Sequence, residues 1–143
     1  MFQGVIKGEP AERTTMWTAL GFPPCAITIP LWVAGGEKLP EITTKTSERD
    51  NAPLCDKVVA LKHKVFPIKR GNGNKYMYFS LLYNETGDGI IQKLQPFEKA
   101  IFEETYKKIT EWNATVWSAE KVINYYKYLN DKVVTIYYEL FGL

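Results

Sequence analysis

The chain has 143 residues, of which 45% are hydrophobic and 14% aromatic, enough apolar material for the core of one ordinary domain. Eighteen lysines and arginines against sixteen aspartates and glutamates leave a net charge of +2, so we expect no nucleic-acid partner. The longest strongly apolar run, residues 25–36, contains Pro30 and is shorter than the roughly twenty residues that cross a bilayer, so we expect no membrane insertion.

The N-terminal sequence MFQGVIKGEP shows no secretion signal, because it lacks a basic region followed by an apolar stretch and a small-residue cleavage site. A mature portion of a longer chain would have lost such a signal. The expected location is therefore the periplasm or the exterior if a longer parent chain carries a signal peptide, and the cytoplasm otherwise.

Two cysteines, Cys25 and Cys55, and the single histidine, His63, are too few for a zinc site, which needs about four ligands. A single disulfide or two buried thiols remain, and buried thiols are the favoured alternative because cysteine often packs as a small apolar residue. No metal and no cofactor are expected.

The N-terminal third predicts three strands. Residues 2–6 form a short strand, and TTMWTAL, residues 14–20, forms a second strand that ends at the Gly-Phe-Pro-Pro corner. CAITIPLWV, residues 25–33, is apolar on both faces, which is typical of a strand covered on both sides. Pro30 lacks a backbone donor, so this strand is expected at a sheet edge or with a bulge.

The middle of the chain predicts a loop, a helix and a further strand. Residues 35–51 show no sustained period and read as a long surface loop, and residues 52–66 have helical spacing of apolar side chains after a capping signal. KRGNGNK, residues 69–75, is a turn rather than a phosphate-binding loop, because it lacks the spacing of such loops. YMYFSLLYN, residues 76–84, is strand-like and ends at the turn NETGDG.

Two long helices close the chain. The first begins near Ile90 and is expected to kink or restart at Pro96, and the second is capped by Ser118 and ends before Gly142. Strands first and helices last predict an α+β fold, a mostly antiparallel sheet with helices on one face. The tyrosines of the last helix have helical spacing and are expected to pack inward rather than to stack on sugars or bases.

No catalytic set is visible among these residues. His63 lies between two lysines on the polar side of its helix and reads as a solvated histidine. Cys55 lies near a helix N-terminus without a basic neighbour, and Cys25 opens a strand, so packing is the favoured role for both thiols.

Three segments in fixed order carry a family resemblance: FQGVIKGEP…TTMWTALGFPPCAITIPLWVAGGEKLP, then APLCDKVVALKHKVFP, then NETGDGIIQKL…FEKAIF. This order resembles the C-terminal half of bacterial N-terminal-nucleophile (Ntn) hydrolases, in particular the isopenicillin-N acyltransferase-like branch, which is related to choloylglycine hydrolases and penicillin V acylases. The resemblance covers most of the chain and rests on structural motifs rather than on a catalytic signature.

The resemblance implies an αββα sandwich that hydrolyses or transfers an amide-linked acyl group. Residues 1–143 would then be a single domain or the C-terminal part of that larger domain. In the cysteine branch, the nucleophile is the first residue exposed by processing and its own α-amino group is the base. Neither Cys25 nor Cys55 can become N-terminal without cutting the fold, so no catalytic residue is carried over and the chain alone is expected to be inactive.

The resemblance also suggests where a substrate would lie. Arg13, Thr15 and Trp17 belong to a strand that could approach the pocket, and they are candidate substrate-binding residues. The alternative places Arg13 in solvent and Trp17 in the core.

An uncovered sheet face is the last expectation. The encoded helices suffice for one side of a sheet of about four strands, so we expect the other side to meet either a missing N-terminal segment or a second copy of the chain. The alternative function is a stand-alone binding or structural module, which the missing nucleophile and the aromatic content favour.

Overall fold

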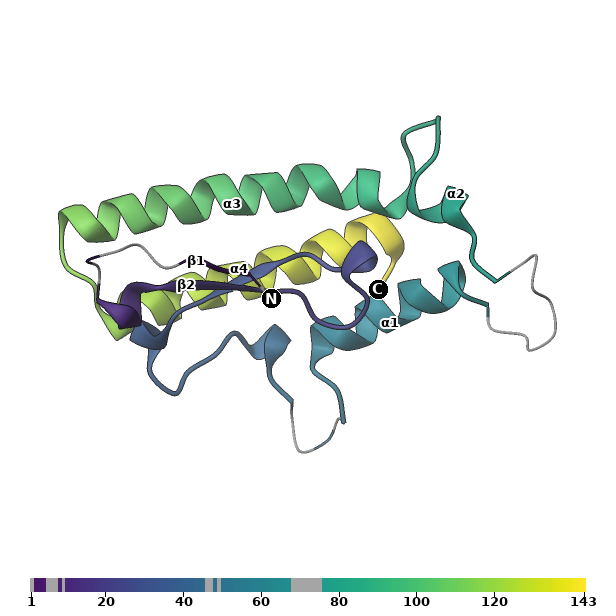
Figure 1. Ribbon diagram of the computed structural model, residues 1–143. Coiled ribbons are helices and arrows are strands. Elements are labelled where there is room, and N and C mark those ends of the chain that lie inside the picture. Colours follow the sequence, from purple (N-terminus) through teal and green to yellow (C-terminus); the bar gives the residue numbers. More distant parts are fainter. Residues whose placement is uncertain (1, 5–7, 9, 46–47, 49, 68–75) are drawn as a thin grey trace.

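The computed structural model describes residues 2–4, 8, 10–45, 48, 50–67 and 76–143. It is an α+β fold in which a small antiparallel sheet lies beside long helices (Figure 1), which confirms the predicted class in this coarse form. The strands are β1 (Phe2–Gly4), β2 (Thr15–Thr18) and β3 (Ile29–Leu31), and the α-helices are α1 (Pro53–Val65), α2 (Phe79–Leu82), α3 (Ile90–Ala114) and α4 (Ala119–Phe141).

The sheet has the order β1-β2-β3, with both pairs antiparallel. Trp17 lies opposite Phe2 on one side and opposite Pro30 on the other. Among the described strands, β3 lies at an edge of the sheet, where proline is tolerated because its missing N–H is not needed to bond to a second neighbouring strand. The predicted edge position of Pro30 is therefore confirmed.

The third strand is shorter than predicted. Residues 23–25 form a 3₁₀ turn, because two prolines fix the backbone there, and Val33–Gly35 form another. The backbone groups that flank β3 bond to tyrosine hydroxyls of α4 instead of to a strand: Ile27 N donates to Tyr137 Oη at 3.1 Å, and Trp32 N donates to Tyr126 Oη at 2.8 Å. These tyrosines cover the free edge of the sheet.

The strand predicted at residues 76–84 is wrong. Residues 79–82 form the short helix α2, which buries Leu82 and leaves Phe79 exposed. The backbone N–H of Tyr78 bonds to Val65 O at 2.9 Å, so this segment is attached to the end of α1 rather than to the sheet. The predicted turn at residues 69–75 lies outside the described residues.

The corner between α2 and α3 depends on Gly89. A Cβ at this position would lie 2.4 Å from Leu82 O, a distance that excludes any side chain. Gln92 Oε1 accepts hydrogen bonds from Gly89 N at 3.1 Å and Asn84 N at 3.0 Å, which satisfies donors at the start of α3. From this start α3 runs through Pro96 without interruption, so the predicted restart there is wrong.

Helices α1 and α4 match their predictions closely. Helix α1 begins and ends within one residue of the predicted range 52–66. The Ser118 hydroxyl accepts from Lys121 N at the start of α4, and Gly142 at its end has a φ of 69°, the left-handed conformation that glycine favours. The prediction that the tyrosines of α4 pack inward is correct for Tyr125, Tyr126 and Tyr137, which are buried, and wrong for Tyr128 and Tyr138, which are exposed.

The predicted surface loop at residues 35–51 is partly held in place. Its residues Glu41–Thr43 form a 3₁₀ turn in which Ile42 is buried, and Ile42 N donates to Asn130 Oδ1 of α4 at 2.8 Å. Residues 46–47 and 49 of this loop lie outside the described residues. Most of its described residues are exposed, as predicted for a surface loop, and Pro40 and Ile42 are the points at which it is anchored to the core.

Within the residues that the structure describes, no helix has the length and apolarity that a bilayer crossing requires.

Candidate functional site

The two cysteines are both free thiols, as predicted, but their surroundings differ. Cys25 has 0% exposure, and burial raises the pKa of its thiol to about 11. Cys55 is only half-buried, so the expectation of two buried thiols is correct for Cys25 alone. His63 is exposed on α1, and no cluster of three or more potential metal ligands occurs among the described residues.

The predicted substrate-binding residues lie at the beginning of β2 and just before it. Arg13 ends a 3₁₀ turn and is half-buried, while Thr15 and Trp17 are two residues apart and so lie on one face of the strand. The Thr15 hydroxyl accepts a hydrogen bond of 2.8 Å from Trp32 Nε1. The centroid of the Trp17 ring lies 4.1 Å from that of the Phe102 ring on α3. Trp17 therefore faces α3, whereas Thr15 holds the indole of Trp32.

Trp17 lines an open groove between β2 and α3, here called the β2–α3 groove. The groove has a volume of about 550 Å³, and its lining is mostly apolar, comprising Trp17, Phe102, Glu103, Tyr106, Lys107 and Ile109. Phe102 is 39% exposed and Tyr106 is 72% exposed. Of the three predicted lining residues, only Trp17 belongs to this groove.

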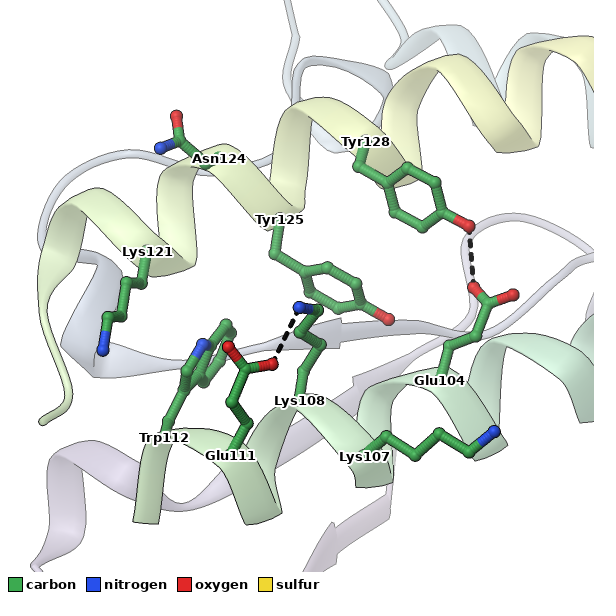
Figure 2. Close-up of a pocket in the computed structure, with 9 residues that line it drawn as sticks. All are labelled: Glu104, Lys107, Lys108, Glu111, Trp112, Lys121, Asn124, Tyr125 and Tyr128. Atoms are coloured by element: carbon green, nitrogen blue, oxygen red, sulfur yellow. Dashed lines mark hydrogen bonds and ion pairs between the residues drawn. The ribbon is translucent and has the colours of Figure 1, made fainter. Parts of the chain in front are cut away.

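A second hollow of about 580 Å³ lies on the other flank of α3, against α4, and is here called the α3–α4 hollow (Figure 2). Its lining residues come from the C-terminal half of α3 and the N-terminal half of α4: Glu104, Lys107, Lys108, Glu111, Trp112, Lys121, Asn124, Tyr125 and Tyr128. Lys107 lines both depressions, so it marks the ridge of α3 between them.

The floor of the α3–α4 hollow is aromatic and held in place. Trp112 is 3% exposed, and its ring packs edge-to-face on Tyr125, Trp117 and Trp32 at centroid distances of 5.9, 5.0 and 5.5 Å. The Tyr125 hydroxyl bonds to the buried Thr105 hydroxyl at 2.8 Å, and burial raises the pKa of Tyr125 to about 12. Tyr125 is therefore a neutral, immobilised part of the wall.

A charged network closes one end of the hollow. Glu104 of α3 accepts hydrogen bonds from Lys132 Nζ and from Tyr128 Oη of α4, the latter at 2.9 Å. Burial tends to raise the pKa of Glu104, but these hydrogen bonds together outweigh it and hold the pKa below its ordinary value. Glu104 is therefore an ion-paired carboxylate whose charge is compensated by Lys132.

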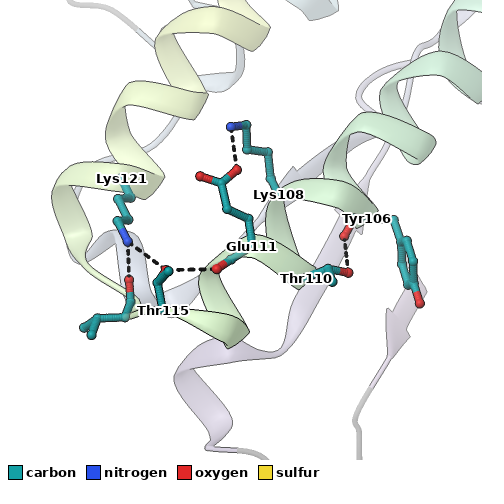
Figure 3. A network of polar contacts seen from close by, with 7 residues as sticks. Tyr106, Lys108, Thr110, Glu111, Thr115 and Lys121 are labelled. Atoms are coloured by element: carbon teal, nitrogen blue, oxygen red, sulfur yellow. Dashed lines mark hydrogen bonds and ion pairs between the residues drawn. The ribbon is translucent and has the colours of Figure 1, made fainter.

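The other end carries two further lysines (Figures 2 and 3). Lys108 Nζ lies 2.9 Å from Glu111 Oε2, and Lys121 Nζ donates to two neutral acceptors, Thr115 Oγ1 at 3.1 Å and Val116 O at 2.7 Å. Thr115 in turn donates to the backbone carbonyl of Glu111, which links the α3 and α4 ends in one chain of contacts. The lysine ammonium groups are thus held at the mouth of the hollow.

Sequence reasoning did not identify this hollow. Of its residues, only the tyrosines of α4 were considered, and they were expected to pack inward, which is correct for Tyr125 and wrong for Tyr128. The available signal was the heptad-like spacing of charges on α3, but only the pairing of α3 with α4 shows which of them meet.

No family model matches the sequence, and no curated protein or solved structure is significantly similar to it.

Proposed function

We propose that this chain is a non-catalytic, C-terminal structural part of an Ntn-type amide hydrolase or acyltransferase, and that it supports a nucleophile carried by another polypeptide segment. The motif order described above supports this assignment. The observation that carries it in three dimensions is the β2–α3 groove, where Trp17, Phe102 and Tyr106 form an accessible apolar surface beside a small sheet. A second polypeptide segment that covered this surface would remove its apolar area from water.

The state of the thiols agrees with a supporting role. A nucleophilic cysteine requires access to substrate and a lowered pKa. Cys25 has neither, since it is fully buried and its thiol pKa is raised to about 11. Cys25 therefore acts in packing, beneath the side chain of Tyr137, whose hydroxyl donates to Cys25 O at 2.7 Å.

The two edges of the sheet indicate where the other segment would join. At the β3 edge, the hydroxyls of Tyr126 and Tyr137 already accept hydrogen bonds from the backbone N–H groups that flank the strand. Within the described residues, β1 pairs with β2 alone. A strand of the partner segment would therefore extend the sheet at β1, and its side chains would cover the neighbouring β2–α3 groove.

Complementation tests the proposal directly. The chain is produced alone and together with the polypeptide encoded immediately before Met1, and amine release is measured on a panel of acyl amides. We expect turnover only from the pair. Turnover by the isolated chain that is lost in Cys25→Ala or Cys55→Ala would contradict the proposal.

A pair of tyrosine variants adds a matched control. Tyr106→Ala removes an exposed side chain from the groove, and Tyr138→Ala removes an equally exposed one, at 69%, from α4. Tyr106→Ala should weaken binding of the partner polypeptide, while Tyr138→Ala should leave it unchanged. Equal binding by both variants would exclude the groove as the contact.

A stand-alone binding module is the second candidate function, and the α3–α4 hollow favours it, since a depression of about 580 Å³ with an aromatic floor has the size of a small-molecule site. The genomic context separates the two. An upstream in-frame segment with a processable cysteine supports the hydrolase, whereas a promoter and a stop codon directly before Met1 support the module.

A further inference from the structure

A dense group of exposed aromatic side chains lies between α1 and α3. Thirteen large apolar side chains are exposed in the part of the chain that the structure describes, and five of them fall within residues 76–83. These five side chains, here called the α2 patch, are between 41% and 70% exposed: Tyr76, Tyr78, Phe79, Leu81 and Tyr83. Apolar side chains that cluster on a surface, unlike scattered ones, mark a site of interaction with a protein or a membrane.

The patch is held at one end of the molecule. Figure 1 shows α2 at the end where α1 stops and α3 begins. The ring of Tyr76 packs edge-to-face on Phe66 at a centroid distance of 5.8 Å, and Tyr78 N bonds to the carbonyl of Val65. The buried side chain of Leu82 fixes α2 from below. The exposed rings therefore project from an ordered backbone, so a binding partner does not have to order this segment first.

The end of α1 beside the patch is basic. Its last turn carries Lys62, His63 and Lys64, of which His63 and Lys64 are exposed, and Val65, which holds Tyr78, follows directly. Among the described residues, neither lysine has an ion-pair partner. Their positive charge is therefore not neutralised within the described part of the fold.

The basic character extends along the sequence. Residues 57–84 contain six lysines and arginines and no aspartate or glutamate, whereas the rest of the chain has twelve basic residues against sixteen acidic ones. The next acidic residues after the patch, Glu85 and Asp88, lie in the turn that leads to α3, where the Asp88 carboxylate accepts a hydrogen bond from the Thr86 hydroxyl. The net charge of +2 is therefore the sum of one strongly positive segment and a negative remainder.

An anionic lipid surface fits both the rings and the charge. Tyrosine is enriched at the boundary between lipid headgroups and hydrocarbon, and phenylalanine and leucine are the apolar contacts of helices that lie in that boundary. Lysines beside the surface are attracted by anionic headgroups. An inorganic anion would leave the apolar side chains in water. A nucleic acid would pair with the cations and stack on the rings, but it offers Leu81 no apolar contact.

We propose that the α2 patch is the contact by which this chain binds peripherally to an anionic phospholipid bilayer. Phe79, Leu81 and the tyrosine rings enter the headgroup region, and Lys62 and Lys64 face the negative headgroups. Such binding needs no helix that crosses the bilayer. It uses neither the β2–α3 groove nor acyl-amide chemistry, so it does not depend on the function proposed above.

Co-sedimentation of the full chain with vesicles tests the proposal. The vesicles consist of phosphatidylcholine alone, or of phosphatidylcholine with about 30% phosphatidylserine. We expect binding to the anionic vesicles to be about tenfold stronger than binding to the neutral ones, and to weaken as salt is added. Equal binding to both kinds of vesicle, or binding to neither, would overturn the proposal.

Two matched pairs of variants locate the contact. Phe79→Ala should weaken binding to the anionic vesicles about fivefold to tenfold, while Tyr138→Ala removes an equally exposed ring of α4, at 69% against 70%, and should leave binding unchanged. Lys64→Ala should weaken binding about fivefold, while Lys127→Ala, at an exposed position of α4, should not. Equal binding by the two members of either pair would contradict the assignment.

Two further measurements identify a different occupant. If a labelled single-stranded RNA binds the parent chain but not Phe79→Ala, and the anionic vesicles do not bind, the patch recognises nucleic acid and the proposal is wrong. If the vesicles do not bind and Phe79→Ala abolishes self-association in sedimentation equilibrium, the patch is an interface between copies of the chain and the proposal is equally wrong. Circular dichroism of each variant checks that the helical fold is retained.

Discussion

The two flanks of the sheet are finished in opposite ways. At the β3 flank, Tyr126 and Tyr137 of α4 are buried and use their hydroxyls to satisfy backbone groups far away in the sequence. On the face of the central strand β2, here called the open flank, the rings of Phe102 and Tyr106 of α3 stay accessible and Trp17 beside them is only half-buried; the β3 side is here called the closed flank. Similar aromatic residues thus cover one side of the sheet and stay accessible on the other.

The difference shows that aromatic content alone does not identify an interface. A tyrosine whose hydroxyl holds buried backbone groups contributes to the stability of the fold, because removing it leaves those groups unsatisfied. A tyrosine with an exposed ring and no such bond contributes little until another surface covers it. The following predictions probe this contrast.

The largest effect is expected at the closed flank. Tyr137→Phe keeps the ring but leaves Ile27 N and Cys25 O without their partner, which should lower the free energy of unfolding by about 2–4 kcal/mol. Urea denaturation followed by circular dichroism measures the change. Tyr138→Phe, on the exposed side of α4, is the control and should stay within about 0.5 kcal/mol of the parent. A neutral Tyr137→Phe would show that the hydroxyl contacts do not stabilise this flank.

The reactivity of the two thiols in the folded protein tests whether the β3 side of the sheet is closed. At a fixed pH below 9, a thiol pKa of about 11 instead of the ordinary 9.0 reduces the thiolate population of Cys25 about a hundredfold, and burial hinders the reagent further. In the folded protein we therefore expect Cys55 to react with an aromatic disulfide reagent and Cys25 to resist it. In denaturant both thiols should react. Rapid modification of Cys25 in the folded Cys55→Ala protein would contradict the closure of this flank.

At the open flank, we expect the isolated chain to self-associate. The apolar lining of the β2–α3 groove can pair across a two-fold axis, and the opposite charges of Glu103 and Lys107 beside it can then match. Tyr106→Asp should weaken this association about tenfold, as expected for loss of a central aromatic contact. Sedimentation equilibrium at micromolar concentration measures it, and a purely monomeric parent chain that binds no apolar-surface dye would exclude an open flank.

Local signals were sufficient to predict helices α1 and α4. Ser118 and Gly142 mark the ends of α4 through capping chemistry that acts within a few residues, and apolar spacing locates α1. The edge position of Pro30 also follows from a local property, its missing N–H.

Features that depend on distant partners could not be predicted. The length of β3 is limited by Tyr126 and Tyr137, about a hundred residues later in the chain. The aromatic run at residues 76–84 suits a strand or a helix equally, and burial of Leu82 against the later helices favours the helix. The α3–α4 hollow likewise exists only once two separate helices pair.

The smallest effect is expected from the charged network beside the hollow, which tests whether the α3–α4 contact contributes to closing the fold. Hydrogen bonds from Lys132 and Tyr128 hold the pKa of Glu104 below its ordinary value of 4.5 in the folded chain. A lowered folded-state pKa means that the stabilisation is present above pH 4.5 and is lost as the pH falls through the folded-state pKa.

Because Glu104 is partly exposed, the contribution of its ion pair to the free energy of unfolding should be only about 0.5 kcal/mol. Glu104→Gln should therefore be slightly less stable than the parent at pH 7, and the difference should be smaller at pH 3. Glu139→Gln, at an exposed position of α4 that lines neither the hollow nor the groove, is the control, and unfolding in urea at both pH values provides the measurement. A difference for Glu104→Gln that is equal at pH 7 and pH 3 would show that its ion pair is not the cause.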